Sequence, residues 1–354
     1  MKRKIILAGG SGFLGQALAT YFQQRGFEVV VLTRRASLRE TTASSPPEEE
    51  REKPLAPCCQ EGSLRAPELA PLSSPGGEGS GERRPVGWDA CTLGPWQHEL
   101  EGALAVVNLT GKSVNCRYNA RNRREIMDSR VNSTRVIGQA IASCEAPPKV
   151  WLNASTATVY KHTFGPAWDE NGQTEASAEA KDKFSVEVAW AWEGALNEAA
   201  TPHTRKVAMR MAMVLGQGRN SVFPVLRRLT RLGLGGRMGN GTQFVSWIHE
   251  SDFCRAVEWL IGHDELAGPV NLTAPGPLPN AEMMRTLRQV CDVPIGLPAT
   301  EWMLEVGAFF LRTETELLIK SRRVIPGRLL QSGFRFEFPG IREAFEDLLR
   351  QKTI

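Results

Sequence analysis

The chain has 354 residues, of which 42% are hydrophobic, so it can bury a sizeable core as one large α/β domain or as a domain with a smaller lobe. The net charge of +4 is modest and no basic stripe with interleaved aromatic residues occurs, so we expect no nucleic-acid partner. No segment approaches the roughly eighteen apolar residues of a membrane span. Seven cysteines without metal-ligand spacing predict reduced thiols in a cytoplasmic protein and no metal site.

An apolar run at 4–8 leads into a glycine-rich turn, an amphipathic stretch and a second apolar run at 28–32. This order predicts a strand, a helix and a second strand. Gly9, Gly12 and Gly15 have the spacing GxxGxxG, which lets the backbone approach a pyrophosphate while the first N–H groups of the helix face the phosphates. We predict a dinucleotide site here, the alternative being a tight turn without a ligand. The expected contacts are Gly9, Gly10, Ser11, Gly12, Phe13, Leu14 and Gly15.

The residues that end the second strand indicate which dinucleotide binds. An NAD site would carry an acidic side chain there for the ribose 2′-hydroxyl, whereas this chain has Thr33, Arg34 and Arg35. Arginine offers planar, bidentate donors to a 2′-phosphate. We therefore expect NADP(H), with Thr33 and Arg34 in contact with it. The alternative is that both arginines are solvated loop charges.

Residues 36–85 differ in composition from the rest of the chain. They are rich in proline and glycine, contain an acidic run at 48–50 and have almost no large apolar side chains. Such a segment cannot bury enough surface to offset its ordering entropy. We expect a disordered insertion without a specific function.

A third apolar run, at 103–109, predicts a buried parallel strand that ends in a polar, glycine-containing loop. Such a loop lies at the carboxyl edge of the sheet, where doubly wound folds bind ligands. The expected cofactor contacts of this loop are Asn108, Leu109, Thr110 and Gly111. Residues 121–142 predict a helix on which Arg124, Ser129 and Arg130 are candidates to reach phosphate or substrate. The alternative is that its charged residues form a solvated face.

The order of these motifs resembles that of the extended short-chain dehydrogenases/reductases. The glycine turn, the strand into Asn108, the hydroxyl-rich strand end at 155–160 and the segment 247–252 occur at their rough spacing. Finer marks resemble an atypical subgroup, the epimerase-family proteins of the YfcH/SDR39U1 kind with a DUF1731-like C-terminal tail. These marks are 108–111, Ser129-Arg130, 232–236, 325–330 and Gly333-Phe334.

The resemblance covers nearly the whole chain apart from the insertion. It implies an α/β Rossmann fold, a doubly wound parallel sheet with a small C-terminal α/β substrate lobe. Residues 1–35 and 86–215 would form the NADP-binding domain, and 216–354 mainly the substrate lobe, with parts returning to the Rossmann core. It also implies an NADP(H) cofactor and a small-molecule substrate, in a monomer or homodimer.

The chain departs from the larger family at the catalytic residues. That family uses a strand hydroxyl, a tyrosine, and a lysine four residues after the tyrosine. None of the three tyrosines here is followed by such a lysine, and the expected helix at about 184–199 presents Ser185 and Ala189 instead. Thr156 aligns with the strand hydroxyl, and Tyr160 is a candidate substitute acid. The alternatives are an ordinary strand-end threonine and a packing tyrosine.

The second half offers substrate-facing candidates. Residues 206–216 predict one core strand whose end, near Met213, passes the nicotinamide, and the glycine-rich loop at 233–241 is typical of a substrate lid. Trp247 and His249 are expected to bind substrate, the alternative for His249 being a hydrogen-bonded core residue. We expect the polar loop that contains Glu170 to be exposed.

Two functions remain open on the sequence alone. One is an NADP(H)-dependent oxidoreductase or epimerase-like enzyme acting on a small carbonyl or sugar-like substrate. The other is a non-catalytic NADP(H)-binding sensor or regulatory protein. The missing Tyr/Lys pair favours the second, while the glycine loop and the segment 247–249 favour the first. We prefer the enzyme.

Overall fold

The computed structural model describes residues 3–34, 81–180, 182–218, 220–299 and 320–351. Its centre is a seven-stranded sheet in the order β10-β6-β5-β4-β1-β2-β3, and every neighbouring pair is parallel. The strands are β1 (Lys4–Ala8), β2 (Glu28–Thr33), β3 (Arg83–Gly87), β4 (Ala105–Asn108), β5 (Val150–Thr156), β6 (Arg205–Met211) and β10 (Gly268–Leu272). The chain runs outward from β1 to β3 and then crosses to β4 on the other side of β1, so the strand order reverses at β1. This confirms the predicted doubly wound α/β fold, which binds ligands at such a reversal.

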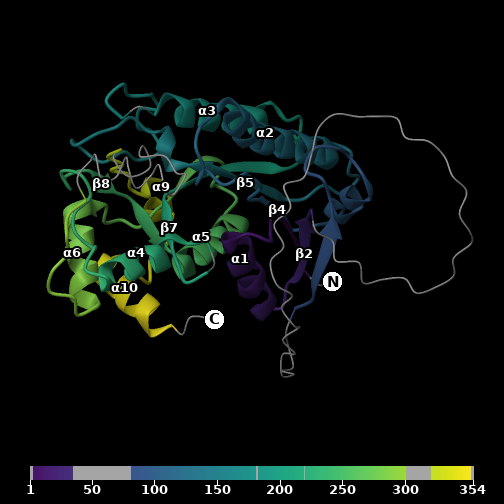
Figure 1. Cartoon of the computed structure of the whole chain (residues 1–354). Helices are drawn as coiled ribbons and strands as arrows, with labels where there is room; N and C mark the ends of the chain where they lie inside the picture. The colour runs from purple at the N-terminus through teal and green to yellow at the C-terminus, as the bar shows by residue number, and fades with distance from the viewer. Residues whose placement is uncertain (1–2, 35–80, 181, 219, 300–319, 352–354) are drawn as a thin grey trace, which may run out of the picture.

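Helices cover both faces of the sheet (Figure 1). α2 (Ala120–Ala142) and α3 (Lys183–Glu198) pack on one face, and α1 (Phe13–Gln24) and α5 (Glu250–Gly262) on the other. Alternate residues of β1 supply the two cores, since Ile5 packs with α1 and α5 while Ile6 packs with α2. Because both faces are buried, the central strands are continuous apolar runs, which is why the sequence revealed them.

The edge strand β3 corrects the expected end of the insertion. Residues 83–85, placed in the insertion by composition, belong to β3, where Arg83 pairs with Val29 and Pro85 with Val31. An edge strand has few buried side chains and tolerates proline, so its composition resembles that of a loop. Residues 81 and 82 of the predicted insertion lead into β3, where Val29 N donates to Glu82 O at 2.8 Å. Residues 36–80 lie outside the described residues.

The predicted single strand at 206–216 is two strands. It breaks at Ala212, whose N–H donates to Leu272 O at 3.1 Å, and β7 (Met213–Leu215) leaves the large sheet to pair with β9 (Trp247–His249). Sequence periodicity did not reveal the break because both halves are apolar. After this break the chain enters a second, smaller body.

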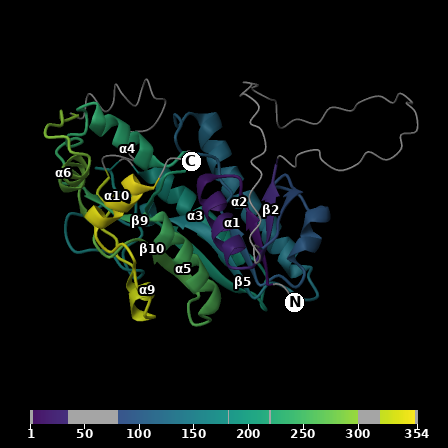
Figure 2. The ribbon, with the colours of Figure 1, turned by 90° about the horizontal axis from the view of Figure 1, so that it is seen from below.

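This second body lies to one side of the sheet, where α4, α6 and α10 group together in Figure 2. Its remaining elements are α4 (Val222–Arg231), β8 (Phe244–Val245), β11 (Leu278–Pro279), α6 (Asn280–Val290) and α10 (Ile341–Arg350). The short helix α9 (Gly327–Gln331) instead packs beside β10, with Leu329 in the core of the large sheet. Phe223 of α4 stacks on Phe345 of α10 in a core of its own. No described helix has both the length and the apolar character needed to cross a bilayer.

Candidate functional site

The glycine turn after β1 is built so tightly that two of its glycines admit no side chain. Gly9 has φ +76°, and a Cβ there would lie 2.9 Å from Thr110 N. A Cβ on Gly15 would lie 2.3 Å from Gly10 Cα. Gly12 is the N-cap of α1, and no described side chain accepts from the first N–H groups of the helix. The turn therefore offers backbone donors at the reversal point of the sheet.

The loop after β4 borders this turn. Leu109 N donates to Ala8 O at 2.9 Å, which joins the ends of β4 and β1. Asn108 is fully buried; its amide donates to Asn153 Oδ1 at 2.7 Å, and its Oδ1 accepts from Thr110 N at 3.0 Å. Asn108 thus holds the backbone of the loop after β4 in place through a buried hydrogen bond. Thr110 Oγ1 is buried and has no hydrogen-bond partner within the described ranges.

Arg34 follows β2 directly at the same edge of the sheet. Leu32, two residues earlier, accepts a hydrogen bond from Gly9 N at 3.3 Å, so the end of β2 adjoins the glycine turn. Thr33 is buried, whereas Arg34 is exposed and forms no ion pair with any described residue. Arg35 lies outside the described residues.

The predicted phosphate-binding residues of α2 differ in their surroundings. Ser129 Oγ accepts from Lys112 N at 2.9 Å and donates to Ile126 O at 3.2 Å, so it holds the loop after β4 in place. Arg124 is exposed on the helix surface. Arg130 lies against the same loop, and a Cβ on Gly111 would be 3.1 Å from its Cζ.

Thr156 ends β5, half-buried beside the end of β6. Its Oγ1 accepts from Thr158 N at 3.1 Å and lies 3.0 Å from Thr158 Oγ1. Through the first of these contacts, Thr156 is the N-cap of a short 3-10 helix, η2 (Ala157–Val159). The hydroxyl is at the sheet edge, as its alignment implies, and it also has a local structural role.

Tyr160 is 1% exposed. Its hydroxyl donates to Asn271 Oδ1 at 2.8 Å and accepts from Arg210 Nη1 at 2.9 Å, and burial raises its pKa. A hydroxyl enclosed in this way does not reach a substrate. The structure therefore favours the packing alternative over a role as substitute acid.

The helix α3 carries no cation at the place where the larger family has its lysine. Ala189 is fully buried and packs with Ala157, Val159 and Tyr160. The C-terminal part of the chain places a buried lysine, Lys320, near the start of this helix. Lys320 donates to Thr158 O at 2.6 Å and forms an ion pair with Asp182, the residue before α3. Sequence analysis missed Lys320 because 162 residues separate it from Thr158 and no local motif marks it.

Glu170 also corrects an expectation. It is 9% exposed rather than solvated, because its carboxylate accepts from Asn271 N at 2.9 Å and from Arg328 N at 3.1 Å. Burial raises its pKa. The carboxylate joins the C-terminal α9 to β10, and this contact has a structural role.

Trp247 and His249 are both fully buried. Trp247 Nε1 donates to Gly276 O at 3.1 Å. His249 Nδ1 accepts from Ser251 N at 3.1 Å as the N-cap of α5, and burial lowers its pKa to about 4. The geometry favours the structural alternative for His249. Trp247 lies in the core, and its expected contact with a substrate stays a prediction. Met213 is half-buried at the start of β7.

The loop after β7 meets the start of α1. Cβ atoms on Gly216 and Gly218 would lie 2.5 and 2.2 Å from the ring of Phe13. Gly216 N also donates to Ser221 Oγ at 3.2 Å, which ties this loop to the start of α4. Phe13 thus connects the glycine turn to the smaller body.

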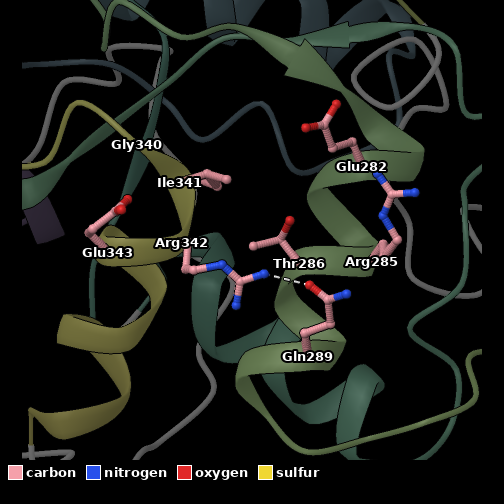
Figure 3. Close-up of a pocket in the computed structure, with 8 residues that line it drawn as sticks. All are labelled: Glu282, Arg285, Thr286, Gln289, Gly340, Ile341, Arg342 and Glu343. Carbon is pink, nitrogen blue, oxygen red and sulfur yellow. Dashed lines mark hydrogen bonds between the residues drawn. The ribbon is translucent and has the colours of Figure 1, made fainter.

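A separate pocket of about 570 Å³ lies between α6 and α10 (Figure 3). Arg342 donates across it to Gln289 Oε1 at 2.5 Å, and Arg285 lines the α6 side. These residues belong to the smaller body and not to the strand ends. No cluster of three or more metal-ligating side chains occurs in the described part of the chain.

Comparison with known proteins identifies the family. Residues 5–272 match the NAD dependent epimerase/dehydratase family, and residues 299–348 match a domain of unknown function, DUF1731. The chain is 27% identical to the epimerase family protein YfhF of Bacillus subtilis over 99% of both chains. It is 35% identical to the epimerase family protein ML0860 of Mycobacterium leprae over 68% of this chain and 75% of that protein.

Solved structures agree on the fold. Human epimerase family protein SDR39U1 (isoform 2) with NADPH matches with a TM-score of 0.75 and 24% identity over 98% of this chain and 100% of that chain. UDP-N-acetylglucosamine 4-epimerase from Bacillus cereus matches with a TM-score of 0.68 and 16% identity over 98% of each. The resemblance inferred from the sequence is confirmed: the chain belongs to the NAD dependent epimerase/dehydratase family.

Proposed function

We propose that the chain binds NADP(H) at the glycine turn. The observation that carries the proposal is the shape of the turn: Gly9 and Gly15 admit no side chain, and α1 begins at Gly12 without a side-chain cap from any described residue. Thr110 Oγ1 borders this turn; it is buried, has no hydrogen-bond partner among the described residues, and so would gain from one on a ligand. A dinucleotide diphosphate on the helix N-terminus fits both features.

NADP(H) is preferred to NAD(H) because Arg34, and not an acidic residue, follows β2. Arg34 is exposed and unpaired among the described residues, so a 2′-phosphate meets no competing carboxylate. The human relative solved with NADPH is consistent with this choice.

We further propose that the protein is an oxidoreductase or epimerase-like enzyme for a small carbonyl or sugar-like substrate held mainly by the lobe of residues 216–354. The nicotinamide supplies or accepts a hydride when the cofactor is bound. Thr156, at the end of β5, is the hydroxyl that would contact the substrate carbonyl. Because Tyr160 is enclosed by Asn271 and Arg210, a bound water or the substrate itself would exchange the proton.

A non-catalytic NADP(H)-binding sensor is the second candidate. Ala189 and the enclosed Tyr160 favour it, because they leave α3 and the end of β5 without the family's usual proton-transfer pair.

Two measurements on the purified protein test these proposals in sequence. Calorimetry with NADPH and NADH tests the cofactor, and we expect tighter binding of NADPH. A screen for NADPH oxidation across carbonyl compounds and nucleotide sugars then tests turnover. Absence of NADPH binding would overturn the cofactor proposal, and binding without turnover on any substrate would favour the sensor.

A further inference from the structure

The guanidinium of Arg130 is fixed next to the loop after β4. Its Nη1 donates to Lys112 O and to Ile126 O, each at 3.0 Å. Its Cζ would be 3.1 Å from a Cβ on Gly111, the residue after Thr110, whose backbone borders the glycine turn. One short loop therefore separates Arg130 from the proposed diphosphate site.

An aromatic side chain holds Arg130 from the other side. Its Cζ lies 5.1 Å from the ring centroid of Trp192 on α3. Trp192 is itself fixed, because its Nε1 donates to Thr134 Oγ1 at 3.1 Å, and Thr134 lies 3.2 Å from Asn153 Oδ1 in the buried network under β4 and β5. A side chain held by two carbonyls and an aromatic ring has already lost its rotamer freedom, which reduces the entropic cost of binding a ligand.

Arg130 has no negative partner within the described ranges. Glu125, on the same helix, pairs with Lys112 and Arg121 instead. Burial lowers the pKa of Arg130 to about 10, so the group remains a cation near neutral pH. A half-buried cation without a counter-charge is costly, and a bound anion offsets that cost.

The hydrogen-bonding pattern leaves one side of the guanidinium free. Nη1 is used by the two carbonyls, whereas Nε and Nη2 form no hydrogen bond with a described residue. These two neighbouring donors match the spacing of two oxygens of a phosphate or carboxylate. We propose that Arg130 forms an anion-binding subsite for such a group, beside the glycine turn. The inference rests on the proposed function and deepens it, since the anion belongs either to the cofactor or to an acidic substrate.

The test compares Arg130→Met and Arg130→Lys with the wild type. Arg135→Met is the matched control, since Arg135 is an exposed arginine of the same helix. Calorimetry measures the Kd for NADPH. Thermal unfolding of the NADPH-saturated protein then measures the Tm in inorganic phosphate against chloride at equal ionic strength. Circular dichroism checks that each variant folds. If Arg130→Met does not fold, the same two measurements are made on Arg130→Lys, which keeps the charge but loses the paired donors.

Two outcomes support the subsite and identify its ligand. If the anion belongs to the cofactor, the Kd for NADPH rises about tenfold to a hundredfold in Arg130→Met and less in Arg130→Lys. If it belongs to a substrate, NADPH affinity stays within about twofold, while the phosphate-dependent rise in Tm seen in the wild type disappears in Arg130→Met.

Two results overturn the proposal, and in both Arg130→Met binds NADPH like the wild type. In the first, the variant keeps the phosphate-dependent rise in Tm; in the second, the wild type itself shows no such rise. Failure of the wild type to bind NADPH overturns the proposed function separately. The phosphate-dependent Tm of the cofactor-free protein then decides the subsite alone.

Discussion

Gly15 and Gly10 lie in direct contact at the start of α1, where a Cβ on Gly15 would be 2.3 Å from Gly10 Cα. Gly12, between them in the sequence, faces open space: the nearest heavy atom to a Cβ there would be Gly9 O at 3.7 Å, and its φ of −77° suits any residue. Gly15 is therefore required by helix packing, whereas nothing in the described fold requires glycine at 12. In the proposed cofactor site, the close approach of a diphosphate would supply that requirement.

This difference predicts opposite behaviour of two alanine variants. Gly12→Ala should leave the Tm of the cofactor-free protein within about 2 °C of the wild type, because the new methyl meets no neighbour. It should raise the Kd for NADPH by about tenfold or more, because the methyl occupies the diphosphate position. Gly15→Ala should lower the Tm itself. Calorimetry and thermal unfolding measure both, and unchanged NADPH affinity in Gly12→Ala would contradict a diphosphate at this turn.

Arg34→Asp should weaken NADPH binding by about 1.5 to 3 kcal/mol, the range for a hydrogen bond to a charged group. NADH binding should barely change, since NADH lacks the 2′-phosphate. Arg135→Asp makes the same charge change at an exposed position of α2 and serves as the control. Equal affinity of the wild type for NADH and NADPH in calorimetry would rule out the role assigned to Arg34.

Deleting residues 37–80 should leave the Tm within a few degrees, because their composition offers little surface to bury. The deletion must stop before β3, and the bridge needs about a dozen glycine and serine residues, because β2 and β3 are parallel and the chain must return along the sheet. Extending the deletion through Pro85 removes part of β3 and should lower the Tm. Loss of cooperative unfolding in the shorter deletion would show that residues 37–80 belong to the folded core.

How far the sequence predicted this molecule depends on where each residue lies. The strands β1, β2 and β4 were predictable because burial on both faces makes them apolar throughout. The tight turn after β1 was predictable because three glycines at this spacing stand between a strand and a helix. The edge strand β3 was not, because its outer side needs no apolar residues.

Long-range partners were the other limit. Glu170 was expected in solvent, but it accepts from Arg328 N, 158 positions later in the chain. His249 carried two open alternatives, and only the folded chain shows that it is fully buried and caps α5. Contacts of this kind leave no local pattern in the sequence.

The buried His249 predicts a loss of stability on acidification. Its folded-state pKa is lowered to about 4, below the 6.5 of an ordinary histidine, so the unfolded state binds the proton more readily. The contribution of neutral His249 to the free energy of unfolding is therefore full above about pH 6.5. Roughly 3 kcal/mol of it is lost as the pH falls to 4. His249→Asn keeps an N-cap acceptor without this titration. From pH 7 to pH 4, the free energy of unfolding measured with urea should fall by about 3 kcal/mol more in the wild type than in the variant. A difference between the two proteins that stays constant with pH would contradict the prediction.

Thr156→Val separates the two candidate functions. In an enzyme, the Thr156 hydroxyl would hydrogen-bond the substrate carbonyl, so the variant should lose about 10²-fold in turnover with unchanged NADPH affinity. The hydroxyl also accepts from Thr158 N at 3.1 Å, so some loss of stability is expected in either case. Thr156→Ser keeps that acceptor and is the matched control, with turnover near that of the wild type. If the wild type reduces no carbonyl substrate and Thr156→Val leaves ligand binding intact, the protein is a binding protein whose strand-end threonine caps η2 and does no chemistry.

Tyr160→Phe tests the packing role of the buried tyrosine. The variant should lower the free energy of unfolding by about 1 to 3 kcal/mol, because Asn271 and Arg210 lose their hydrogen-bond partner. It should leave the pH dependence of turnover unchanged.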